Sequence, residues 1–99
     1  MPAPDSNLTP QRRRERIVRR RALAAALASA RCAAGLTQHQ LAEKAGLSRS
    51  AIARVESGEA SISSDRIWDL ARALGVRPSA LYLIAEADEA AAETLKPEK

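Results

Sequence analysis

Alanine supplies twenty-two of the forty-five hydrophobic residues in this 99-residue chain, and this share limits the core that the chain can build. Phenylalanine is absent, and Trp68 and Tyr82 are the only aromatic residues. Because alanine, arginine, leucine and glutamate favour helices and β-branched residues are few, we expect an all-α fold. A chain of this length buries only about 60–65% of the surface of its unfolded form, so a core so poor in bulk favours oligomerisation.

Several classes of protein are disfavoured by what the sequence lacks. Cys32 is the only cysteine, which excludes an internal disulfide, and its alanine neighbours predict a small buried side chain rather than a reactive thiol. His39 has no second histidine with which to hold a metal, and we expect it at the surface, with a place near a phosphate as the alternative. No paired carboxylates, phosphate-binding loop or activated nucleophile is visible, so we expect neither an enzyme nor a cofactor. Without an 18-residue apolar run or a signal peptide, we expect a cytoplasmic protein with no membrane partner.

Charge is distributed unevenly along the chain. Residues 1–34 carry a net charge of +6, residues 35–82 carry +1, and residues 83–99 carry −3. Seven arginines fall within residues 12–21, a density that destabilises a lone helix and favours a polyanionic partner. Nucleic acid is the partner that we expect, and a merely solubilising tail or contact with an anionic membrane surface are the alternatives.

Capping residues and helix breakers divide the chain into helices. Thr9 followed by Pro10 is typical of a helix start, and no breaker occurs before Gly35, so one long helix is expected. Its inward positions are Ile17, Leu23, Leu27, Ala30 and Ala34. The same reasoning predicts a second helix over residues 38–45 and a third that is capped at residue 48 and ends at 55 or 56. A fourth is expected over 63–74, a short fifth from residue 78, and a last one in the helix-prone stretch 85–95.

Two of these helices, separated by a short turn with a glycine, form a helix-turn-helix pattern. Ala42 is small enough for the two helices to cross closely, and Gly46 provides positive φ just after the first helix. Leu47, Ile52 and Val55 are placed to fix the second helix onto the first. Each feature is weak alone, but their spacing over about twenty residues strongly indicates the motif.

The segment GLTQHQLAEKAGLSRSAIARVESG at residues 35–58, with LARALGV at 70–76, resembles the phage-repressor family of DNA-binding domains, the Cro and lambda-repressor-like group called XRE. The resemblance covers residues 22–82. It implies a compact five-helix domain, here preceded by a basic N-terminal arm or helix extension (residues 1–21) and followed by an acidic helical tail (residues 83–99). The two flanking segments match nothing in the family pattern.

The resemblance implies roles for individual residues. Arg49, Ser50 and Arg54 of the recognition helix would contact bases in the major groove, where arginine suits guanine. Contacts to phosphates are expected from the helix starts and from the basic arm, namely from Thr37, Gln38, Ser48, Ser57, Arg12, Arg13, Arg16 and Arg20. In the family, a glutamine at the position of Gln38 also braces the recognition helix.

Further residues are assigned structural roles. An arginine late in the family's first helix pairs with a glutamate ending the recognition helix, and Arg31 and Glu56 match these positions, which makes Glu56 a structural carboxylate rather than a catalytic one. Glu59 and Ala60 depart from the family, since many relatives carry basic residues in this loop.

An apolar run follows the common core and indicates a dimer interface. It comprises Leu81, Tyr82, Leu83 and Ile84, to which we add the helix over 85–95 and Trp68. For the tail, the alternative is that it folds back on its own domain; for Trp68, the alternative is a half-buried place at the edge of the core.

The sequence therefore predicts a homodimeric transcriptional repressor that reads a palindromic operator in double-stranded DNA. The alternative is an antitoxin-type regulator, in which the same unit also captures a toxin or another protein. A stoichiometric partner that co-purifies with the chain would favour the alternative.

Overall fold

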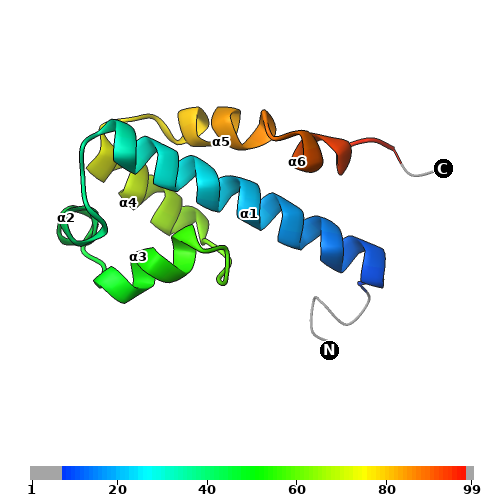
Figure 1. Ribbon diagram of the computed structural model, residues 1–99, viewed down its shortest axis with the longest axis horizontal. Coiled ribbons are helices and arrows are strands. Elements are labelled where there is room, and N and C mark those ends of the chain that lie inside the picture. Colours follow the sequence, from blue (N-terminus) through cyan, green and yellow to red (C-terminus); the bar gives the residue numbers. More distant parts are fainter. Residues whose placement is uncertain (1–7, 98–99) are drawn as a thin grey trace.

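The structure is a computed structural model, which describes residues 8–97 of the chain, and these residues form six helices and no strand (Figure 1). The helices are α1 (Pro10–Ala33), α2 (Gln38–Ala45), α3 (Arg49–Glu56), α4 (Ser64–Leu74), α5 (Pro78–Glu86) and α6 (Glu89–Glu93). The all-α prediction is thus confirmed. None of the helices in the described part of the chain is both long enough and apolar enough to cross a bilayer.

Helix α1 is the axis of the molecule, with α2, α3 and α4 on one side and α5 and α6 along the other (Figure 1). It begins where the sequence predicts, because the side-chain oxygen of Thr9 accepts a hydrogen bond from the Arg12 backbone N–H at 3.1 Å. Its first half projects beyond the bundle, at the end away from α2. The helix runs without a break through the expected boundary between residues 21 and 22, and residues 1–7 of the expected arm lie outside the described residues.

The main core lies where α1 meets α2, α3, α4 and α5. Its fully buried large side chains are Leu27, Leu41, Ile52, Leu70 and Leu81. The burial of Leu81 corrects the prediction that this residue is an exposed part of a dimer interface. Leu81 lies on the side of α5 that faces the core, and none of its surface is exposed, so it is unavailable to a second subunit.

A second, smaller cluster joins the tail to α1. Ala22 and Ala26 of α1 pack with Ala85 of α5 and Ala91 of α6, and these small side chains allow close helix packing. The tail therefore folds back on its own domain, the alternative left open by the sequence. The continuous helix expected over residues 85–95 is wrong, because α5 ends at Glu86 and Asp88 then caps α6, accepting a hydrogen bond from the Ala91 backbone N–H at 2.9 Å.

Three other residues that we expected to face the core are exposed, and one alternative for a fourth, Trp68, is wrong. Cys32 and Ala34 are exposed, because they fall on the outer side of the last turn of α1 and its end. Ile17 is 39% exposed because it lies in the projecting half of α1, beyond the main core. Trp68 is 67% exposed, so it is not a half-buried residue at the edge of the core.

Candidate DNA-binding surface

Helices α2 and α3 form a helix-turn-helix unit whose geometry is fixed by local hydrogen bonds. Gly46 ends α2 with φ +70°, a left-handed conformation that glycine adopts without strain. The Leu47 backbone N–H then donates to the Ala42 carbonyl at 2.9 Å, which closes the helix end. Ser48 begins α3 by accepting a hydrogen bond from the Ala51 backbone N–H at 3.1 Å. The turn is therefore held at both ends by caps that the sequence encodes.

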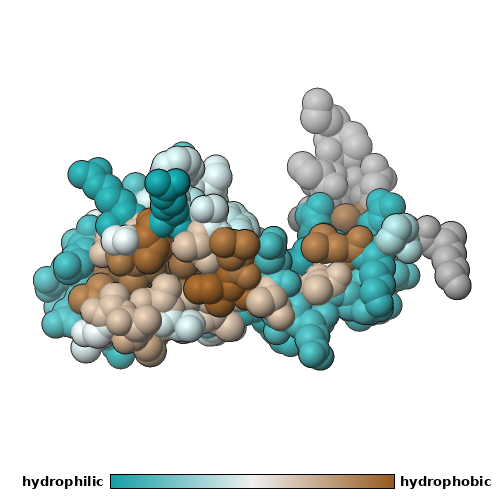
Figure 2. All heavy atoms as spheres, turned by 90° about the horizontal axis from the view of Figure 1, so that it is seen from above, coloured by the Kyte–Doolittle hydropathy of each residue, from teal (hydrophilic) through white to brown (hydrophobic). Residues whose placement is uncertain are grey.

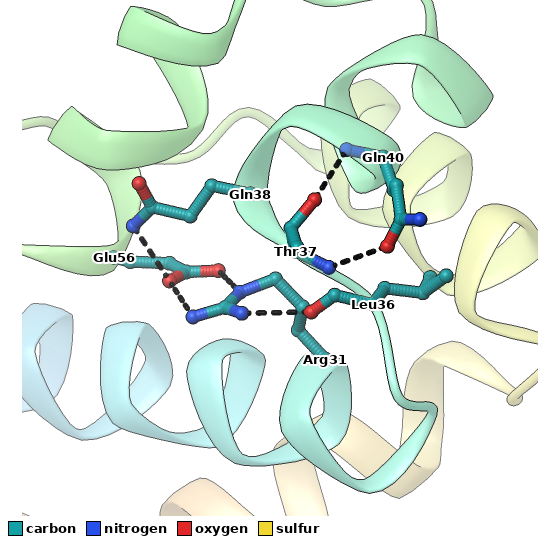
Figure 3. A network of polar contacts seen from close by, with 6 residues as sticks. All are labelled: Arg31, Leu36, Thr37, Gln38, Gln40 and Glu56. Carbon is teal, nitrogen blue, oxygen red and sulfur yellow. Dashed lines mark hydrogen bonds and ion pairs between the residues drawn. The ribbon is translucent and has the colours of Figure 1, made fainter.

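A network of polar side chains ties the end of α3 to α1 and α2 (Figure 3). The guanidinium of Arg31 makes two hydrogen bonds to Glu56, from Nε to Oε2 at 2.8 Å and from Nη2 to Oε1 at 3.0 Å. Its Nη1 donates to the Leu36 carbonyl at 2.8 Å, and Gln38 Nε2 donates to Glu56 Oε1 at 3.1 Å. The Glu56 carboxylate thus connects the end of α3 to the end of α1 and the start of α2.

This ion pair is largely removed from solvent. The side chain of Arg31 is 16% exposed and that of Glu56 is 6% exposed. The hydrogen bond to Glu56 raises the pKa of Arg31 above its ordinary value, although burial acts in the opposite direction. The pairing of Arg31 with Glu56 orients α3 relative to α1.

The start of α2 carries a capping box. The side-chain oxygen of Thr37 accepts a hydrogen bond from the Gln40 backbone N–H at 3.1 Å, and Gln40 Oε1 accepts one from the Thr37 backbone N–H at 2.9 Å. Thr37 is exposed and Gln38 is partly buried. The amide of Gln38 has a second N–H besides the one that it donates to Glu56.

The residues expected to contact bases lie together on the outer side of α3. Arg49, Ser50 and Arg54 are all exposed, while Ile52 and Val55 on the opposite side are buried in the core. No ion pair joins Arg49 or Arg54 to a carboxylate within residues 8–97. Both guanidinium groups are thus available to an external ligand.

The serines at the two ends of α3 already make local hydrogen bonds. Ser48 caps the helix, as described above, and Ser57 Oγ donates to the Arg54 carbonyl at 2.9 Å. Both residues remain exposed, so neither hydroxyl is withdrawn from a molecule that approaches α3.

The basic residues of α1 do not adjoin the exposed side of α3 as a group. Arg12, Arg13 and Arg16 are exposed and Arg20 is partly buried, and all four belong to the first half of α1. The half of α1 that carries them runs away from α3 (Figure 1), so their charge extends beyond the helix-turn-helix unit.

Two other arginines of α1 make contacts that the sequence analysis missed. Arg19 Nε donates to Thr94 Oγ1 at 2.8 Å and its Nη2 donates to the Thr94 carbonyl at 2.9 Å, so Arg19 holds the end of α6. Arg21 lies against Gly58, where a Cβ atom would be 3.1 Å from Arg21 Cγ. Neither contact could be found from the sequence, because the partners are distant along the chain.

Comparison with known proteins agrees with this geometry. A family model described as Helix-turn-helix matches residues 27–81, more than half of the chain. The chain therefore belongs to the helix-turn-helix family, in its XRE-type branch, and is a DNA-binding transcriptional regulator. No curated protein sequence is similar enough to be matched to it.

Solved structures of two proteins illustrate the likeness. The restriction-modification controller protein C.AhdI from Aeromonas hydrophila is 38% identical, with a TM-score of 0.60, over 62% of this chain and 92% of that one. The clp gene regulator ClgR from Corynebacterium glutamicum is 31% identical in one crystal structure, with a TM-score of 0.70, over 76% of this chain and 79% of that one. A second ClgR structure is 29% identical, with a TM-score of 0.66, over 81% of this chain and 96% of that one.

Proposed function

We propose that the chain acts as a homodimeric repressor, placing α3 of each subunit in the major groove of a palindromic operator. The observation that carries this proposal is the two-sided character of α3. One side presents Arg49, Ser50 and Arg54 to solvent, while Ile52 and Val55 anchor the other side in the core. A helix so anchored can present its polar side chains to base edges without losing its orientation.

The polar residues of α3 suit direct reading of bases. The guanidinium of Arg49 or Arg54 can donate to O6 and N7 of one guanine together, which is worth about 1–3 kcal/mol of discrimination. Ser50 can donate or accept a hydrogen bond, so it tolerates more than one base. Specificity would therefore rest more on the arginines than on Ser50.

Contacts to phosphates would position this helix. Gln38 can brace Glu56 with one amide N–H and donate the other to a phosphate, while its neighbour Thr37 offers a hydroxyl at the start of α2. The remaining phosphate contacts that we propose come from Ser48, Ser57, Arg12, Arg13, Arg16 and Arg20. Because the arginines project from the end of α1, they would reach phosphates beyond those flanking α3.

A surface over α4 and α5 is our proposed dimer interface. Leu83 is 63% exposed and Ile84 is 45% exposed, with Trp68 and Tyr82 as further exposed apolar side chains. Apolar residues form a broad area over α5 when the molecule is viewed from that side (Figure 2). Burying such an area against a second copy would add the core that the alanine-rich chain lacks.

Selection of bound sequences from random DNA, with the stoichiometry measured, tests the proposal. We expect a twofold-symmetric site that binds two chains. Arg54→Ala should weaken binding to the selected site by about 5–150-fold and relax its sequence at one position per half-site. The matched control is Arg72→Ala on the exposed side of α4, which should bind like the parent protein. Equal loss in both variants would contradict base reading by Arg54.

Sedimentation equilibrium tests the interface. We expect Leu83→Asp to convert dimers to monomers without unfolding, since Leu83 is mostly exposed in the monomer. A dimer of unchanged stability would place the interface elsewhere. Recovery of the chain with a different protein in a fixed ratio would instead favour the antitoxin-type alternative.

A further inference from the structure

A hollow of about 660 Å³ lies between the first half of α1 and the segment formed by α5 and α6. It is closed on a third side by Ser61 and Ile62, in the loop before α4. The volume is within the roughly 300–1,000 Å³ that small-molecule sites occupy. Some residues that line it, Arg13, Arg16 and Arg20, are also proposed phosphate contacts, and Tyr82 belongs to the proposed dimer interface. The proposed DNA binding gives no role to the space between them.

Apolar side chains line the hollow and remain uncovered by other parts of the described chain. Ile17 is 39% exposed, Tyr82 is 48% exposed and Leu95 is 69% exposed, and all three contribute to the lining. Near the end of α6, Figure 2 shows a small apolar area surrounded by hydrophilic residues. Covering these side chains would be favourable, at about 25 cal/mol per Å² of apolar surface.

The charge around the hollow is strongly positive. Arg13, Arg16 and Arg20 line it, whereas Glu86 is the only carboxylate of residues 8–97 that does so. Neither Arg13 nor Arg20 forms an ion pair within those residues, and Arg20 is also partly buried. A partly buried arginine beside an apolar surface, without a carboxylate partner, favours an anionic ligand.

Because exposed apolar side chains and arginines without a carboxylate partner line the same hollow, we propose that it binds an amphiphilic carboxylate. The carboxylate would accept hydrogen bonds from Arg13 and Arg20, and an unbranched acyl chain would lie against Ile17, Tyr82 and Leu95. A second copy of α1 is a poor occupant, because its own arginines would face those of the hollow.

Isothermal titration of the full chain with dodecanoate tests this site. The stretch of α1 from residue 13 to residue 23 that lines the hollow is about 15 Å long, which suits an acyl chain of this size. We expect one dodecanoate per chain, below the concentration at which dodecanoate aggregates. Dodecanol, which keeps the chain and lacks the charge, should bind at least about 10-fold more weakly.

Two matched pairs of variants locate the ligand. Arg20→Gln should weaken dodecanoate binding by about 10-fold, whereas Arg72→Gln on α4 should not. Leu95→Ser should weaken it, whereas Val76→Ser, at an exposed apolar residue that neither lines the hollow nor belongs to the proposed dimer interface, should not. Since Leu95 and Val76 are both exposed, neither change should unfold the chain.

Several results would overturn the proposal. One is equal affinity for dodecanol and dodecanoate, which would mean that the arginines take no part. Another is equal loss in the two members of either pair, which would place the ligand elsewhere. No saturable binding of dodecanoate, with dimerisation weakened by Leu95→Ser, would show that a second copy covers the hollow instead.

Discussion

Replacing Arg31 with alanine should destabilise the whole domain, although Arg31 itself lies outside the proposed DNA-binding surface. The substitution removes two hydrogen bonds to Glu56 and one to the Leu36 carbonyl. It leaves the Glu56 carboxylate with Gln38 as its remaining hydrogen-bond partner, on a side chain that is only 6% exposed. The cost is therefore that of a buried charge without its counter-ion, in addition to that of three lost hydrogen bonds.

The magnitude follows from the burial of the pair. Breaking a buried ion pair by removing one partner costs about 3–5 kcal/mol. We take the lower end, about 3 kcal/mol, because the Arg31 side chain keeps 16% exposure and Gln38 continues to bond Glu56. Each kcal/mol lowers the melting temperature of a domain of 60–100 residues by about 4–8 °C, so we expect a fall of roughly 12–24 °C.

Thermal unfolding followed by circular dichroism measures this fall. The control is Arg72→Ala, an exposed arginine that should change the free energy of unfolding by less than about 0.5 kcal/mol. A double-mutant cycle with Glu56→Gln should show a coupling energy well above that of an exposed pair. A fall of less than about 4 °C for Arg31→Ala would refute the reasoning, because the carboxylate would then be solvated in the variant.

Three further outcomes are expected from other parts of the molecule. Gly58→Ala should destabilise the domain more than Gly35→Ala, since both positions have positive φ but the new Cβ meets Arg21 Cγ at 3.1 Å only at Gly58; equal melting temperatures would contradict this. Arg19→Gln should speed backbone hydrogen exchange in α6 while leaving the core protected, because both hydrogen bonds that hold the end of α6 are lost. Arg13→Gln should reduce the slope of log affinity for DNA against log salt by about 0.9, as expected for one lost phosphate contact, and an unchanged slope would exclude that contact.

The elements that the sequence predicts well are those set by neighbouring residues. Thr9, Thr37 and Ser48 each cap the helix that follows them, and Gly46 ends α2 with positive φ, because caps and turns depend on a few adjacent positions. The outward side of α3 follows from helical periodicity in the same way. Local chemistry thus suffices to place α3 and its exposed arginines.

The errors arise where burial depends on segments distant along the chain. The run around Leu81 is apolar on every side, so periodicity alone could not show which of its residues faces the core. The alanines next to Cys32 predicted that Cys32 is buried, but alanine also occurs on exposed helix surfaces, and Cys32 is exposed. The contact of Arg19 with Thr94 joins residues 75 positions apart and has no local pattern.

The basic first half of α1 and the acidic tail are separate in the sequence but depend on each other in the structure. Arginines at this density repel one another, and the projecting half of α1 would be a marginal helix alone. Helix α6 supports it at two places: Ala91 packs against Ala22, which directly follows this half, and Arg19 places a positive charge at the C-terminal end of α6. We therefore expect the tail to help to keep the arginines of this half of α1 in position relative to α3. Affinity for phosphates should therefore depend on a segment whose own charge is negative.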